Sequence, residues 1–68
     1  MPINKVIEIM SESDKSWEDA AQKAVDEAAV TLKGIRSIWI KDLSAHVEND
    51  QIKTYRVTSK ITFVVERR

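Results

Sequence analysis

Hydrophobic and polar residues alternate most regularly near the C-terminal end of the chain. Between Ile52 and Glu66, most residues of one parity are apolar and most of the other are polar. A period of two predicts a β-strand with one buried and one exposed face. The apolar set is Tyr55, Val57, Ile61, Phe63 and Val65, and the polar set is Arg56, Thr58, Lys60, Thr62 and Glu66.

A helical period replaces this alternation between Trp17 and Leu32. Apolar residues, mainly alanines, recur there at spacings of three and four, which is typical of an amphipathic helix. Ser16 is expected to cap its start, because acidic side chains occupy the first turn. Lys33 and Gly34 are expected to supply a basic last turn and the stop.

Three strands are predicted around this helix. The segment Lys5–Met10 is rich in β-branched residues, and the polar residues 11–16 are expected to connect it to the helix. A second strand is expected over Ile35–Val47 and a third over Ile52–Glu66. The residues between them, Glu48–Gln51, have turn chemistry.

The order strand, helix, strand, strand predicts an α+β fold, with a single domain over residues 1–68. The hairpin makes the last two strands antiparallel, and the helical connection returns the first strand beside the third, in the order 1-3-2. The helix spans about 25 Å, whereas the longest strand spans about 50 Å. One helix cannot cover such a sheet, so its uncovered ends and edges predict a homo-oligomer.

Composition limits the classes of partner. The 11 basic and 11 acidic residues cancel, so no global field favours nucleic acid or a membrane surface. The chain has no Cys, which removes disulfides and thiolate metal sites. A chain this short buries only roughly 60% of its unfolded surface, so self-association is the expected source of further stability. We expect a cytoplasmic protein.

Familiar catalytic motifs are absent from the sequence. One Gly excludes a glycine-rich phosphate loop, and there is no zinc-protease motif, nucleophile elbow or Cys/His pair. One helix and one sheet leave little room for a water-excluding active site except between subunits. The sequence therefore argues against an enzyme.

Four segments resemble the dodecin family: KVIEI near the start, SWEDAAQKAVDEA in the helix, T-x-x-x-I after it, and TYRVTSKITFVVE at the end. The resemblance runs from Lys5 to Glu66. It implies a β-α-β-β unit whose antiparallel sheet wraps around its helix, and twelve copies that form a hollow shell. It also implies a non-enzymatic protein that binds or stores a small ligand.

The residues that hold flavin in this family are replaced here. Many dodecins bind a flavin (riboflavin, FMN or FAD) between subunits, with a Trp of the second strand stacked on the ring and a Gln of the third strand hydrogen-bonded to it. These positions match Ser37 and Arg56. A serine at the position of the family Trp removes a stacking surface worth roughly 1–3 kcal/mol. The resemblance therefore implies a non-standard ligand site, closer to members that lack both residues.

Trp39 lies two residues beyond Ser37, so both point to the same face of the strand. We expect this indole outside the core of its own chain. It is either a displaced platform for a flat ligand or an anchor at a subunit contact, and the enrichment of aromatic residues at interfaces favours the contact. Arg56 is a candidate cation–π partner. The residues expected on this face are Ser37, Trp39, Lys41, Arg56 and Thr58, with Ile38 and Ile40 against the helix.

A second subgroup of dodecin-like proteins is associated with calcium, and the helix opening SWED resembles it. The candidate oxygen ligands are Glu48, Asn49 and Asp50 in the turn, or Glu12 and Asp14 before the helix. Calcium takes about six to eight oxygen ligands, so several subunits or waters would have to contribute. A solvated turn and a helix-start loop are the simpler interpretations of these clusters. Flavin storage through Trp39, calcium binding and a purely structural assembly remain open.

Overall fold

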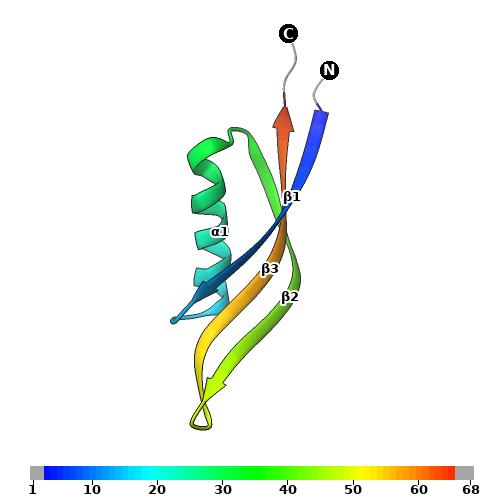
Figure 1. The fold of residues 1–68 in the computed structure, drawn as a ribbon. Coiled ribbons are helices and arrows are strands. Elements are labelled where there is room, and N and C mark those ends of the chain that lie inside the picture. Colours follow the sequence, from blue (N-terminus) through cyan, green and yellow to red (C-terminus); the bar gives the residue numbers. More distant parts are fainter. Residues whose placement is uncertain (1–2, 66–68) are drawn as a thin grey trace.

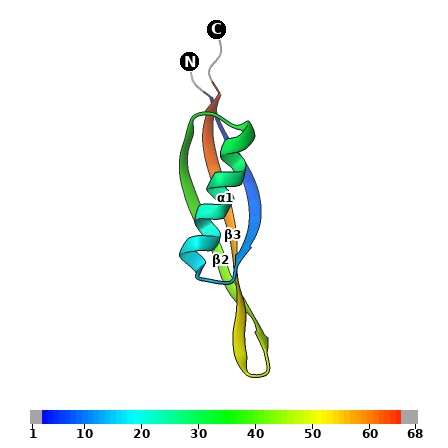
Figure 2. The ribbon, with the colours of Figure 1, turned by 90° about the vertical axis from the view of Figure 1, so that its left-hand side faces the viewer.

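The computed structural model describes residues 3–65. It contains β1 (Ile3–Ser13), α1 (Trp17–Thr31), β2 (Ile35–Glu48) and β3 (Gln51–Val65), in that order. The strands form an antiparallel sheet in the order β1-β3-β2, as the sequence predicted. The helix lies along one face of this sheet, and the β2–β3 hairpin continues beyond it (Figures 1 and 2).

The core lies between α1 and the face that the central strand β3 presents to it. Ala24, Ala28 and Ile61 form a buried cluster, with Ile7 and Ile38 packed against it from the two outer strands. The small alanine side chains let the helix approach the sheet closely, which is why the largest core residues come from β3. The predicted apolar parity of β3 is confirmed, since Val57, Ile61 and Phe63 are buried.

The first strand is longer than predicted. The residues Ser11 to Ser13 were expected in the connection to the helix, but they continue the pairing of β1 with β3 as far as Ser13 opposite Tyr55. Hydroxyl hydrogen bonds replace the missing apolar contacts in this segment. Ser11 Oγ donates to the carbonyl oxygen of Ala20 at 2.6 Å, so the polar end of β1 is tied to the helix.

A hydrogen-bond network fixes the start of α1. Ser16 is the predicted N-cap, and its hydroxyl accepts from the backbone N–H of Asp19 at 2.9 Å. The Ser13 hydroxyl donates to the Asp19 carboxylate at 2.5 Å and accepts from the backbone N–H of Lys15 at 2.9 Å. The Asp19 carboxylate also lies 3.5 Å from Lys23 Nζ. The hydrogen bond from Ser13, followed by the charges of Lys23 and Lys15, lowers the pKa of Asp19 below its ordinary 3.8, against an opposing desolvation.

This carboxylate makes stability depend on pH. Because the pKa of Asp19 is lower in the folded chain, its contribution is fully present above the unfolded pKa and is lost as the pH falls through the folded value. We therefore expect the wild-type protein to lose stability below about pH 4 more steeply than Asp19→Asn does. Urea unfolding of both proteins at neutral and acidic pH measures this. Equal pH dependence of the two proteins would contradict the assignment.

The helix ends one residue earlier than predicted. Leu32 is the C-cap and its N–H donates to the carbonyl of Ala28 at 2.9 Å. Lys33 therefore lies beyond the helix, and the last turn contains no basic residue, which corrects the expected basic last turn. Gly34 has φ of 76°, a conformation that favours glycine, and it turns the chain into β2.

The hairpin extends well past the helix. Asn49 and Asp50 both have positive φ, 51° and 63°, which is the geometry of a tight type I′ turn. The 15 residues of α1 span about 22 Å, whereas the described chain is 55 Å long. The predicted difference in length between the helix and the sheet is therefore present. No helix within residues 3–65 is both long and apolar enough to cross a membrane.

Candidate functional site

The sheet face turned away from α1, here called the open face, carries most of the predicted site residues. Alternation along β3 directs Val57, Ser59 and Ile61 toward the helix, and the residues between them toward the open face. The pairing of the three strands then orders this face in rows across the sheet. These rows are Val6–Thr62–Ser37, Glu8–Lys60–Trp39, Met10–Thr58–Asp42 and Glu12–Arg56–Ser44.

Trp39 lies in one of these rows and is 62% exposed, outside the core as predicted. Its partner on β3 is Lys60, whose Nζ lies 5.1 Å from the centroid of the indole ring. A cation at this distance over an indole is a favourable cation–π contact. The ammonium thus orients the ring while leaving much of it in contact with solvent.

Two further contacts define the surroundings of the indole. Ser37, one row away, shares a hydrogen bond of 2.6 Å with the hydroxyl of Thr62. Lys41 Nζ donates to Glu8 Oε2 at 3.1 Å, and Glu8 lies opposite Lys60 in the row of Trp39. The site therefore combines a hydroxyl pair, two ammonium groups and one carboxylate around an exposed aromatic ring.

Arg56 lies apart from the indole, which corrects the predicted cation–π partner. Its guanidinium holds Glu12 Oε2 through Nε at 2.7 Å and through a terminal nitrogen at 2.6 Å. Arg56 is four residues from Lys60 along β3 and therefore about 13 Å from the row of Trp39. It is about 20 Å from the row of Ser37 by the same measure. A small ligand that contacts both Arg56 and Ser37 would therefore need these two residues from different chains.

Irregularities in β2 explain why the side chain of Lys41 lies on the open face and that of Leu43 on the helix face. The register shifts between Ile35 and Ser37 and between Ile40 and Asp42, so Arg36 and Lys41 are extra residues in the strand. A bulge re-aims the side chains that follow it. Leu43 therefore pairs with the buried Val57 and joins the helix face, a position that strict alternation from Ile40 does not predict.

The helix face has an uncovered apolar groove of about 320 Å³ between α1 and β2. Trp17 forms one wall, because its Nε1–H donates to the carbonyl of Ser44 at 2.9 Å and its ring meets Tyr55 edge to face at 4.8 Å. Trp17 therefore packs against residues of its own chain. Ile40 and Leu43 remain 38% and 53% exposed. The lining residues are Trp17, Glu18, Ala21, Ile40, Leu43 and Val57.

The predicted calcium ligands are only loosely grouped within one chain. Glu48, Asn49 and Asp50 occupy the hairpin turn, where Glu48 lies 3.7 Å from His46 Nε2. Glu12 is bound to Arg56. In the described part of the chain, no three His, Cys, Asp or Glu side chains converge as a metal site. Calcium at the turn would therefore need ligands from a second copy or from water.

Comparison with known proteins gives consistent results over nearly the whole chain. A sequence model of the family described as Dodecin matches residues 3–66. The chain is 33% identical to Calcium dodecin of Mycobacterium tuberculosis over 63 residues, which cover 93% of this chain and 89% of that protein.

Solved structures show the same fold. A mutant dodecin of Thermus thermophilus superposes with a TM-score of 0.93 at 24% identity, covering 98% of this chain and 100% of the other. The calcium dodecin of M. tuberculosis, a calcium-chelating antigen with a calcium-binding site, superposes with a TM-score of 0.82 at 31% identity. The superposition covers 94% of this chain and 91% of the calcium dodecin chain.

Proposed function

The chain belongs to the dodecin family, and from that premise we propose that it is a non-enzymatic protein whose copies assemble into a hollow dodecamer and bind a small ligand. The observation that carries the ligand site is the exposed Trp39, held by Lys60 on the open face. An aromatic ring in contact with solvent and bordered by hydroxyl and ammonium groups offers a stacking surface and polar anchors to a flat, polar molecule.

Assembly is supported by the groove beside α1. Ile40 and Leu43 are exposed next to the fixed ring of Trp17, and the hairpin continues beyond the helix without cover from its own chain (Figure 2). Burying such surface is the main favourable term in association. We propose that neighbouring copies cover it, and that the same assembly brings Arg56 of one copy toward Ser37 and Trp39 of another.

The ligand site is tested with riboflavin and FMN as probes. We expect saturable quenching of flavin fluorescence by ligand-stripped protein, and an affinity about 5- to 150-fold weaker in Trp39→Ala, because an aromatic platform contributes about 1–3 kcal/mol per stacked ring. Trp39→Phe keeps a ring and is the matched control. Quenching that persists in Trp39→Ala would show that Trp39 is not part of the flavin site.

Calcium binding is the second candidate, favoured by the similarity to Calcium dodecin. Its ligands would be Glu48, Asn49 and Asp50 of the turn, completed by another copy or by water. The same stripped protein distinguishes the two candidates. A rise in melting temperature with calcium, and no response to flavin, would favour calcium over the stacked ligand.

A further inference from the structure

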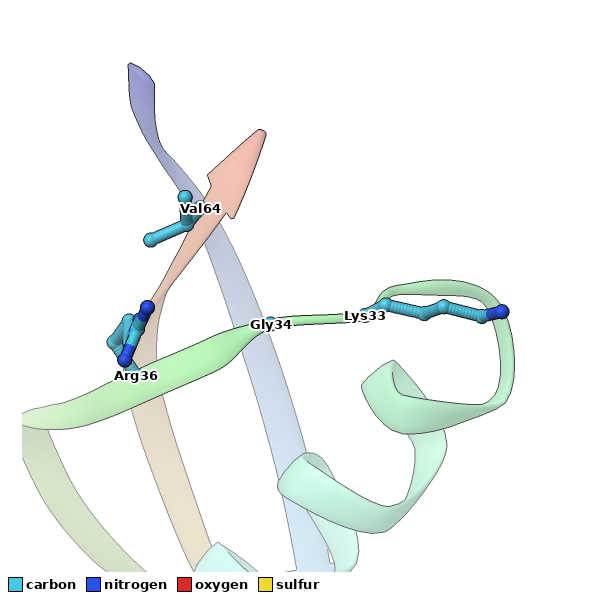
Figure 3. A pocket seen from close by; sticks show the side chains of 4 residues that line it. All are labelled: Lys33, Gly34, Arg36 and Val64. Atoms are coloured by element: carbon cyan, nitrogen blue, oxygen red, sulfur yellow. The ribbon is translucent and has the colours of Figure 1, made fainter. Parts of the chain in front are cut away.

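A second hollow, here called the basic pocket, lies where the chain passes from α1 into β2. It is an open hollow of about 300 Å³, and the described residues that line it are Lys33, Gly34, Arg36 and Val64. Figure 3 shows Arg36 and Val64 on one side of Gly34 and the long side chain of Lys33 on the other. Among residues 3–65, the charged side chains that line this hollow are those of Lys33 and Arg36, and both are positive.

The backbone holds the pocket in shape. The carbonyl of Gly34 accepts from the N–H of Val64 at 3.0 Å, which ties the start of β2 to the end of β3. A Cβ at Gly34 would come within 3.2 Å of the Val64 carbonyl oxygen, and the positive φ of 76° disfavours other residues as well. Gly34 therefore allows the two segments to approach closely and leaves the hollow open above them.

The two cations of the pocket form no ion pair within residues 3–65. Both Lys33 and Arg36 are exposed, and Arg36 is the extra residue of a β-bulge, opposite no residue of β3. The ion pairs among residues 3–65 involve other basic groups, on Lys23, Lys41, His46 and Arg56. Lys33 turns away from Arg36 in Figure 3, but its four-carbon stem is flexible, so the ammonium group can change position.

The charges around the pocket decide which ion it accepts. The C-terminal end of α1 contributes roughly half a negative charge, whereas Lys33 and Arg36 contribute two full positive charges. Among the residues that the structure describes, this balance favours an anion. A guanidinium presents two parallel N–H donors that match the oxygens of a phosphate group, and a lysine adds a point charge.

We propose that the basic pocket binds phosphate, either as the free ion or as the phosphate group of a small organic molecule. Arg36 holds two phosphate oxygens and Lys33 closes over a third. This site is additional to the one around Trp39 and does not depend on it. Its ligand class, a compact dianion, also differs from the flat ring expected on the open face.

Calorimetric titration of the whole protein with inorganic phosphate, at constant ionic strength, tests this proposal. We expect saturable binding with one site per chain, weakened at least about tenfold in Arg36→Gln by loss of a charge-assisted hydrogen-bond partner. Lys33→Gln should weaken binding less than Arg36→Gln, because it removes only a mobile point charge and no paired donors. Arg36→Lys, which keeps the charge without the paired donors, should lie between wild type and Arg36→Gln.

Lys53→Gln is the matched control, since it removes one exposed positive charge on the distal hairpin and should leave the affinity unchanged. Titration with methyl phosphate distinguishes the two sources, because tighter binding than inorganic phosphate points to an organic ligand and weaker binding to the free ion. Absence of saturable heat with either at millimolar concentration, or equal affinity in Arg36→Gln, would overturn the proposal. Neither result depends on the flavin response or on the mass of the assembly.

Discussion

Replacing Leu43 by Asp is expected to convert the assembled protein into smaller species. Leu43 is 53% exposed in one chain and lines the apolar groove with Trp17 and Ile40. If a neighbouring copy covers this groove, the new carboxylate loses its hydration without gaining a partner. A buried unpaired charge weakens association by more than about a hundredfold. Sedimentation velocity of the variant against the wild type measures the change.

Leu43→Met is the control for this position. It keeps an apolar side chain of similar volume, which costs less than about 1.5 kcal/mol in a packed site, and should sediment as the wild type does. Circular dichroism shows whether each variant remains folded. A folded Leu43→Asp protein that sediments like the wild type would show that no copy covers this groove.

Replacing Ile61 by Ala is expected to cost about 2–5 kcal/mol of the free energy of unfolding. Ile61 is fully buried and packs with Ala24 and Ala28 at the centre of the core. The buried residues on the helix side are alanines, which cannot extend into the cavity that the change leaves. Chains of this size have a total stability of only about 3–10 kcal/mol, so the variant is expected to be close to unfolding. Urea unfolding measures the loss.

Ile61→Val provides the comparison, because removing one methyl group from a buried Ile typically costs about 0.5–1.5 kcal/mol. The two variants should therefore fall in order, with Ala the more destabilised. A loss below about 1 kcal/mol in Ile61→Ala would mean that the core collapses around the gap, contrary to the rigid contact between α1 and β3.

The regular parts of the fold could be predicted from local sequence signals. The alternation on β3 identified the buried face, and the cap at Ser16 located the start of α1 correctly. The strand order followed from the short hairpin and the helical connection. The end of β1 was not predictable, because Ser11 and Ser13 carry no apolar pattern. Their place in the strand depends on hydrogen bonds to Ala20 and Asp19, which only the packed helix supplies.

The candidate site was predicted less completely, for reasons that lie in the register of β2. Alternation placed Trp39 on the open face, but the extra residue Lys41 reverses which face the side chains after it point to. As a result Leu43 joined the apolar groove without any sequence signal except the break in alternation. The cation over the indole also depends on register, since pairing brings Lys60 opposite Trp39 and leaves Arg56 with Glu12.

Native mass spectrometry of the wild-type protein tests the central claim most directly. If copies of this 7.8 kDa chain assemble as proposed, they should be found as a closed symmetric particle of about twelve copies. The Leu43→Asp protein should fall below this mass in the same experiment. A wild-type protein that remains a stable single chain at micromolar concentration would contradict the assembly, and with it the proposal that copies meet around Trp39.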